Sequence, residues 1–220
     1  IFSNVYSDIG ERMITDIDFF YYNTKSNVLS EVLELNEYYV VSEFSFFKKH
    51  LNRRVNKKKE FSIEPHFKIL DYNEKLINLK KLIKTKMKTN GVNVPNYDYQ
   101  LLNSIYNHQI NDRGFIKLHV NLRSMYESSQ IYKKKRKLSF NNKYINRYFL
   151  LSNHYKINII NSSVKDNNSK FRLKLRKNIL FKKLDTFIVK LILLSNLRLV
   201  QIIEFINNSN YRKYIIKNKF

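Results

Sequence analysis

The chain contains no cysteine, tryptophan or alanine, and it has only three glycines and two prolines. The absence of cysteine excludes disulfide bonds and thiolate metal sites. The glycines are scattered at positions 10, 91 and 114, so no phosphate-binding glycine loop can form. The five histidines lack the H-x-x-x-H spacing of common zinc sites. We therefore expect that the protein is not an enzyme and has no cofactor of its own, apart from structural Mg²⁺ that arrives with RNA.

Long apolar runs are also missing. The best one, Phe187–Leu194, is short and is interrupted by Lys190, whereas a membrane-spanning helix needs about 18 or more apolar residues. This predicts a soluble or peripheral protein without a transmembrane span. The chain starts at Ile1 rather than at Met, so we expect the natural protein to start further upstream.

Positive charge is what the chain has in excess. The formal net charge is +23 on 220 residues, together with 43% apolar and 15% aromatic residues. The apolar content is enough for a folded core, and so much uncompensated charge in a folded chain favours a polyanionic partner, above all nucleic acid. The frequent Asn, Ile, Lys, Tyr and Phe have A/T-rich codons, which indicates an organellar, most simply mitochondrial, gene and accounts for part of the charge.

The charge divides the chain into three predicted segments. Residues 1–47 have eight acidic and two basic residues, a net charge of −6. Since the whole chain has +23, residues 48–220 have a net charge of +29. We expect residues 1–47 to be an acidic, aromatic extension that contacts a neighbouring protein or belongs to the same core. Residues 48–92 form a predicted basic helical segment, and residues 93–220 a predicted α+β RNA-binding core.

Apolar spacing in the basic segment predicts an amphipathic helix over Tyr72–Met87, with lysines on the rest of its surface. Asn90-Gly91 would end this helix. Only Glu74 is acidic among these lysines, so we expect the helix to face RNA.

Two segments of the core alternate apolar and polar residues, Ile116–Asn121 and Phe171–Arg176. Such alternation predicts strands with one apolar and one basic face. Amphipathic helices are predicted over Asn142–Asn153, with Ile145, Tyr148 and Phe149 inward, and over Leu180–Ser195. Together these elements predict an α+β fold, in which helices cover one face of an antiparallel sheet and the opposite, basic face meets RNA. A mainly helical N-terminal extension would precede it.

The candidate RNA-binding residues are the cations and one amide of this predicted face and its loops. They would neutralise phosphates, while neighbouring aromatic rings stack on unpaired bases. The full set is Lys117, Asn121, Arg123, Lys133, Lys134, Lys135, Arg136, Lys137, Lys143, Arg147, Arg172, Lys174, Arg176 and Lys177. The acidic pairs Asp16/Asp18 and Glu34/Glu37 could bind Mg²⁺ as nucleases do, but they lie in the segment least suited to nucleic acid.

The order of these predicted elements resembles ribosomal protein five of the large subunit, the 5S-rRNA-binding family. Residues 117–121 resemble the family's first strand, Leu150–Asn153 its helix end, and Arg172–Arg176 its second strand, which a helix follows at once. Asn208–Tyr211 is similar to a family turn. The Gln-Lys-Pro of the family is replaced by residues 154–156, a family glycine is replaced by Lys177, and the family's last strands are absent.

The resemblance covers about residues 95–216 and implies a place in the central protuberance of a mitochondrial ribosome. It implies contact with 5S rRNA, neighbouring ribosomal proteins and the small-subunit head, and proximity to the P-site tRNA. The function predicted is thus a structural, rRNA-binding ribosomal constituent. Two alternatives stay open: a peripheral accessory subunit of an organellar respiratory membrane complex, and a fragment similar to an intron maturase.

Overall fold

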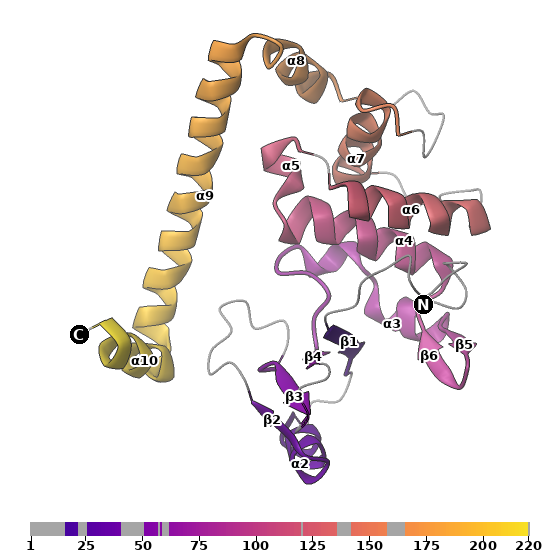
Figure 1. Cartoon of the computed structure of the whole chain (residues 1–220), viewed down its shortest axis with the longest axis vertical. Helices are drawn as coiled ribbons and strands as arrows, with labels where there is room; N and C mark the ends of the chain where they lie inside the picture. Colours follow the sequence, from indigo (N-terminus) through magenta and orange to yellow (C-terminus); the bar gives the residue numbers. More distant parts are fainter. Residues whose placement is uncertain are drawn as a thin grey trace. The chain divides into compact units, whose positions relative to one another are not determined.

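A computed structural model (Figure 1) describes residues 16–21, 26–40, 51–56, 58, 62–119, 121–135, 142–157 and 166–219. Ile69–Asn178 belong to one compact unit, and Thr15–Lys68 with Ile179–Phe220 belong to another. We call these the helical unit and the sheet unit, and describe each by itself. The structure mixes helices with small sheets, which confirms the expected α+β class.

The sheet unit contains four strands in the order β1-β4-β3-β2. β1 (Asp16–Phe20) runs parallel to β4 (Ser62–His66), whereas β3 (Arg54–Asn56) is antiparallel to both β4 and β2 (Tyr38–Val40). Helix α2 (Ser26–Leu35) lies between β1 and β2 in the chain. The described part of the N-terminal segment therefore has two strands beside one helix, where the sequence predicted mainly helix.

Two C-terminal helices complete the sheet unit. α9 (Ile179–Asn207) packs against α10 (Ser209–Lys219). The Asn208 Oδ1 atom accepts hydrogen bonds from the backbone N–H groups of Asn210 and Tyr211 and so caps α10. Arg212 donates to the carbonyl of Ile206 at 2.6 Å, which satisfies one of the free carbonyls at the end of α9.

The helical unit is built mainly from helices. Its elements are η2 (Glu74–Leu76), α3 (Leu79–Lys84), β5 (Met87–Thr89), β6 (Val92–Val94), α4 (Tyr97–Tyr106), the π-helical turn η3 (Asn107–Asn111), α5 (Gly114–Lys117), α6 (Leu122–Lys135), α7 (Lys143–His154) and α8 (Asn167–Leu175). α4 packs on both α6 and α7, and the main apolar core lies among them. The predicted helix over Asn142–Asn153 is confirmed as α7, and Ile145, Tyr148 and Phe149 are buried as expected.

Both predicted core strands are wrong. Phe171–Arg176 lies mostly in helix α8, where Leu173 is buried and Phe171 is 64% exposed, so the alternation does not separate an apolar from a polar face. Ile116–Asn121 begins in the short helix α5, and the chain turns at Leu118, which is buried with a φ of 48°. The predicted basic sheet that these two segments would build is therefore not formed by them.

The predicted helix over Tyr72–Met87 is shorter than expected, because only Leu79–Lys84 is α-helical. Met87 instead starts a hairpin in which Lys88 pairs with Asn93 and Thr89 with Val92. The turn residues Asn90 and Gly91 have φ angles of 49° and 81°. Two successive left-handed residues of this type form the tight turn that joins antiparallel strands.

The predicted C-terminal helix is confirmed within α9, which continues to Asn207. Its expected apolar face is not buried, because Leu180, Leu184, Phe187, Ile188 and Leu191 are 45–71% exposed.

Candidate nucleic-acid interface

Three of the predicted RNA-binding arginines contact the protein's own backbone. Arg147 of α7 and Arg172 of α8 donate to the carbonyls of Phe115 and Ile116, each at 2.8 Å. Arg176, which follows α8, donates to the carbonyl of Leu118 at 3.1 Å. These carbonyls lie at the end of α5 and just beyond it, where intrahelical hydrogen-bond partners run out and cations are favourable.

Arg147 has a second structural role. Its Nε donates to Asp166 Oδ2 at 2.9 Å, and its guanidinium lies 3.6 Å from the centre of the Phe115 ring. Burial alone would raise the pKa of the Asp166 carboxyl. Hydrogen bonds from Arg147 and Ser169 outweigh burial, so that pKa lies below its ordinary value.

Lys117, Asn121 and Arg123 also make intramolecular contacts. Lys117 Nζ donates to the carbonyl of Asp112 at 2.8 Å, and Asn121 Oδ1 accepts the backbone N–H of Ser124 at the start of α6. Arg123 pairs with Glu127 one turn later on α6, at 3.4 Å. Six of the predicted site residues are thus hydrogen-bonded within the fold.

The other predicted site residues lie on exposed surface or outside the described side chains. Lys133, Lys134, Lys143, Lys174 and Lys177 are exposed, and the Lys143 ammonium lies 5.2 Å from the centre of the Tyr144 ring. The side chain of Lys135 and the whole of Arg136 and Lys137 lie outside the described part of the chain. The RNA-binding role of the predicted set therefore stays a prediction, and six of its members also have a structural role inside the fold.

A different group of cations is exposed together on residues 75–88, and we call it the lysine patch. It consists of Lys75, Lys80, Lys81, Lys84, Lys86 and Lys88, all exposed. None of the six has an ion pair or a side-chain hydrogen bond among the described residues. The sequence predicts that these lysines face RNA, although they are not among the candidate RNA-binding residues given above.

Local folding explains why the lysines of α3 point outward. Leu82 is buried and Leu79 and Ile83 are partly buried, whereas Lys80, Lys81 and Lys84 occupy the opposite side of the helix. Asn78 starts the helix, because its Oδ1 accepts the backbone N–H of Lys81 at 3.0 Å.

The hairpin has the same two-sided character. Met87 is partly buried and its partner Val94 is buried, while Lys88 and its partner Asn93 are exposed. Lys86, directly before β5, is exposed as well. α3 and the hairpin lie next to each other in the chain and in Figure 1, and each has its cations on the side away from the core.

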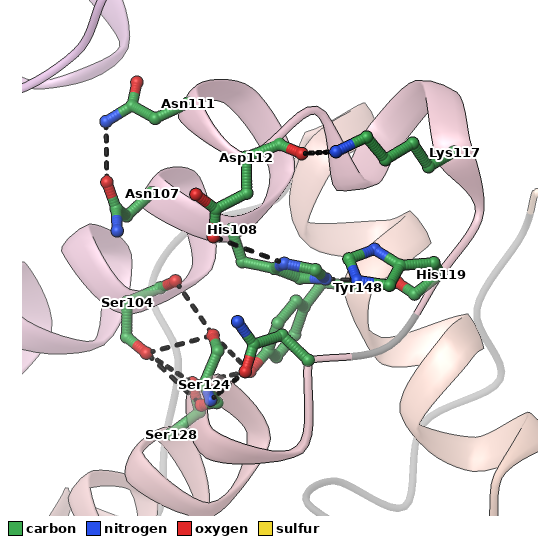
Figure 2. Close-up of polar contacts among 11 residues, drawn as sticks. Ser104, Asn107, His108, Asn111, Asp112, Lys117, His119, Ser124, Ser128 and Tyr148 are labelled. Atoms are coloured by element: carbon green, nitrogen blue, oxygen red, sulfur yellow. Dashed lines mark hydrogen bonds and ion pairs between the residues drawn. The ribbon is translucent and has the colours of Figure 1, made fainter. Parts of the chain in front are cut away.

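A polar network inside the helical unit is not a surface site. The Tyr148 hydroxyl lies 3.2 Å from Ser124 Oγ and 2.9 Å from Ser128 Oγ, and Ser128 also donates to Ser104 (Figure 2). Burial raises the pKa of Tyr148 to about 12. These hydroxyls satisfy one another, so the network joins α4, α6 and α7.

One group of three potential metal ligands occurs in the described residues. Asp18 and Glu64 are opposite each other on the parallel strands β1 and β4, and His66 Nε2 lies 3.1 Å from Asp18 Oδ1. Arg53 Nε lies 3.9 Å from Glu64 Oε1 and supplies a positive charge to the same group. The group thus joins two carboxylates, one imidazole and one guanidinium at the paired ends of β1 and β4.

α9 is the most apolar exposed element described. It contains an 18-residue window of mean hydropathy 1.7 that is 6% buried, so its length and composition would allow it to cross a membrane. At 1.5 Å per residue the helix is about 43 Å long, against a hydrocarbon core of about 30 Å. The helix is longer than the short run noticed in the sequence, and the absence of a transmembrane span stays a prediction.

We found no match for this chain among protein-family models, curated proteins or solved structures. The resemblance to the ribosomal family stays a prediction, and two of the strands on which it depended are not strands in the structure. The function must therefore be inferred from the residues themselves.

Proposed function

We propose that the protein is a structural RNA-binding constituent of an organellar ribosome, and that the lysine patch is its main contact with rRNA. The supporting observation is that six exposed lysines occur within residues 75–88 without an ion pair among the described residues. An ammonium group that is already paired must break that pair to bind a phosphate, and these six need not.

The chemistry of lysine suits this role. Each ammonium is a compact positive charge on a flexible stem, so it binds phosphate oxygens without requiring one orientation. Each phosphate that is neutralised releases condensed counterions, and this gain in entropy supplies much of the affinity. The net charge of +23 adds long-range attraction to the same partner.

Arg147, Arg172 and Arg176 contribute indirectly. Their hydrogen bonds to the carbonyls of residues 115–118 hold α7 and α8 to α5. In this proposal they stabilise the helical unit that presents the patch, and RNA binding depends mainly on the lysines.

The salt dependence of binding tests RNA recognition. RNA affinity of the full chain is measured by fluorescence anisotropy between about 50 and 200 mM salt, the range in which proteins with several phosphate contacts lose most of their affinity. We expect a steep, linear decrease of log K with log salt. A flat dependence would contradict RNA binding.

Sedimentation of the native protein tests the ribosomal assignment. In an organellar lysate the protein should sediment with ribosomal particles and return to the top of the gradient after RNase treatment. Sedimentation that RNase does not change, together with recovery in the membrane fraction, would overturn the assignment.

The exposed apolar surface of α9 favours a second candidate function, that of a subunit of an organellar membrane complex. In that case the exposed cations of α10, Lys213 and Lys217, would meet anionic lipid headgroups. Extraction of organellar membranes at alkaline pH separates the candidates. A protein inserted through α9 stays with the membrane, and a ribosomal protein does not.

A further inference from the structure

We propose that the lysine patch binds the phosphate backbone of double-stranded RNA rather than unpaired bases. The inference depends on the proposed RNA-binding function and specifies the class of RNA that the patch accepts.

The patch offers few surfaces on which bases could stack. Tyr72 is the only aromatic residue in the continuously described stretch from 72 to 94, and the Arg113 guanidinium lies 4.0 Å from the centre of its ring. Proteins that bind single strands combine cations with aromatic rings, and each stacked base contributes about 1–3 kcal/mol. With a single exposed ring in this stretch, over which a guanidinium already lies, the patch has little that would favour an unpaired strand.

The groups that are present match a duplex. A-form RNA offers a regular surface of phosphates and 2′-hydroxyls, and proteins recognise it by its shape through these groups. The patch supplies three ammonium groups on one side of α3, that of Lys88 on the hairpin and that of Lys86 directly before it. Beside them the exposed amide of Asn93, opposite Lys88, can donate to and accept from a 2′-hydroxyl.

The scaffold under these groups is ordered. α3 is anchored by buried Leu82 and capped by Asn78, and the hairpin is anchored by Val94 and closed by the tight Asn90-Gly91 turn. The lysine side chains can change rotamer, but the backbone that carries them is fixed by these contacts. The backbone positions of the lysines are therefore fixed, and the regularly spaced phosphates of a rigid duplex can match them. A flexible single strand would lose more conformational entropy on binding.

The test compares two labelled RNAs at one salt concentration, a 20-base-pair duplex and an unstructured 20-nucleotide strand. The full chain is measured beside a patch variant (Lys80→Gln, Lys84→Gln, Lys86→Gln and Lys88→Gln). A charge-matched control changes four exposed lysines of α9 and α10 (Lys182→Gln, Lys183→Gln, Lys213→Gln and Lys217→Gln). Circular dichroism of both variants checks that they are folded.

We expect the wild-type chain to bind the duplex about tenfold more tightly than the single strand. The patch variant should lose this preference, and its salt slope should decrease by about one for each phosphate-binding lysine removed. The control should weaken both RNAs by the same smaller factor, because it changes only the net charge. A second measurement uses only the wild-type chain and so does not depend on the folding of any variant. In it, the duplex should protect the patch lysines from acetylation.

Three results would overturn the inference. A wild-type preference for the single strand, or equal losses in the patch variant and the control, would contradict duplex binding by the patch while RNA binding itself survives. If the duplex did not slow acetylation of the patch lysines, this too would contradict duplex binding by the patch. If the wild-type chain bound neither RNA, the proposed function would fail together with the inference.

Discussion

Arg172 of α8 donates a hydrogen bond to the backbone carbonyl of Ile116, 2.8 Å away, across 56 positions of sequence. The sequence predicts that this guanidinium binds RNA, whereas in the structure it is hydrogen-bonded to a carbonyl of the helical unit. The contact separates two tasks that a basic protein must perform with the same residue types, holding its own fold together and attracting a polyanion.

Replacing Arg172 by alanine should therefore reduce stability more than RNA affinity. The free energy of unfolding should fall by about 1–2 kcal/mol, because a charged donor to the Ile116 carbonyl is lost. Urea denaturation measures this loss. Lys174→Ala on the same helix is the control, since an exposed lysine away from such contacts changes stability by no more than about 0.5 kcal/mol. A larger effect at Lys174 than at Arg172 would contradict the assignment.

The pair between Arg147 and Asp166 should make stability depend on acid. The pKa of Asp166 is lowered in the folded state, so the pair stabilises the fold above the ordinary carboxyl pKa near 4. This stabilisation is lost as the pH falls through the lowered pKa. Arg147→Gln should be less stable at neutral pH by about 1–3 kcal/mol, because Asp166 keeps a partly buried charge without its partner. Unfolding measured at about pH 6 and pH 3 should show a smaller acid effect in the variant than in the wild type.

Gly114 should not tolerate a methyl group. A Cβ at this position would lie 2.7 Å from the backbone carbonyl oxygen of His108, a contact that the backbone must move to relieve. We expect Gly114→Ala to destabilise the protein by about 1–3 kcal/mol, measured by thermal unfolding. Gly91→Asn is the comparison, because that turn has open space around the glycine and asparagine accepts positive φ. Equal losses at both positions would contradict the steric explanation.

Tyr148→Phe should remove a hydroxyl shared by Ser124 and Ser128 and destabilise the protein by about 1–2 kcal/mol at neutral pH. The folded state keeps this phenol neutral up to a pKa of about 12. Its contribution is therefore complete below about pH 10, the ordinary phenol pKa, and disappears as the pH rises toward 12.

The alkaline loss of stability should consequently be smaller in Tyr148→Phe than in the wild type. The exposed Tyr155 provides the control, since Tyr155→Phe should leave the neutral-pH stability unchanged. Chemical denaturation at about pH 8 and about pH 11 gives the free energy of unfolding at each pH, and the difference is the alkaline loss. A Tyr148→Phe protein with an unchanged alkaline loss would show that this hydroxyl is not the group responsible.

Helix α7 could be predicted because its pattern is long and unambiguous. Ile145, Tyr148 and Phe149 recur at helical spacing, and Asn142 before them caps the helix, as its Oδ1 accepts two backbone N–H groups. The general class, α+β, is confirmed, but its strands are not the two segments that the sequence predicted as strands.

The two strands were predicted wrongly because six residues are too few to distinguish the periods. In residues 171–176 the alternation is real, but Arg172 and Arg176 are also four apart, the spacing that places both on one side of a helix. Their tertiary partners, the carbonyls at the end of α5, cannot be inferred from spacing. Asn90-Gly91 was interpreted as a helix stop, although this dipeptide is a strong hairpin signal between short β-prone runs.

The parallel pairing of β1 with β4 has a consequence for how the chain is made. β4 pairs with β3 over a short loop, but Asp16 of β1 faces Ser62 of β4 and needs a long stretch of chain to be closed first. On a translating ribosome β1 emerges early and has no β4 to pair with until His66 has been synthesised. An edge strand that waits in this way exposes its backbone to other chains. The sheet should therefore be completed late, when β1 pairs with the newly made β4.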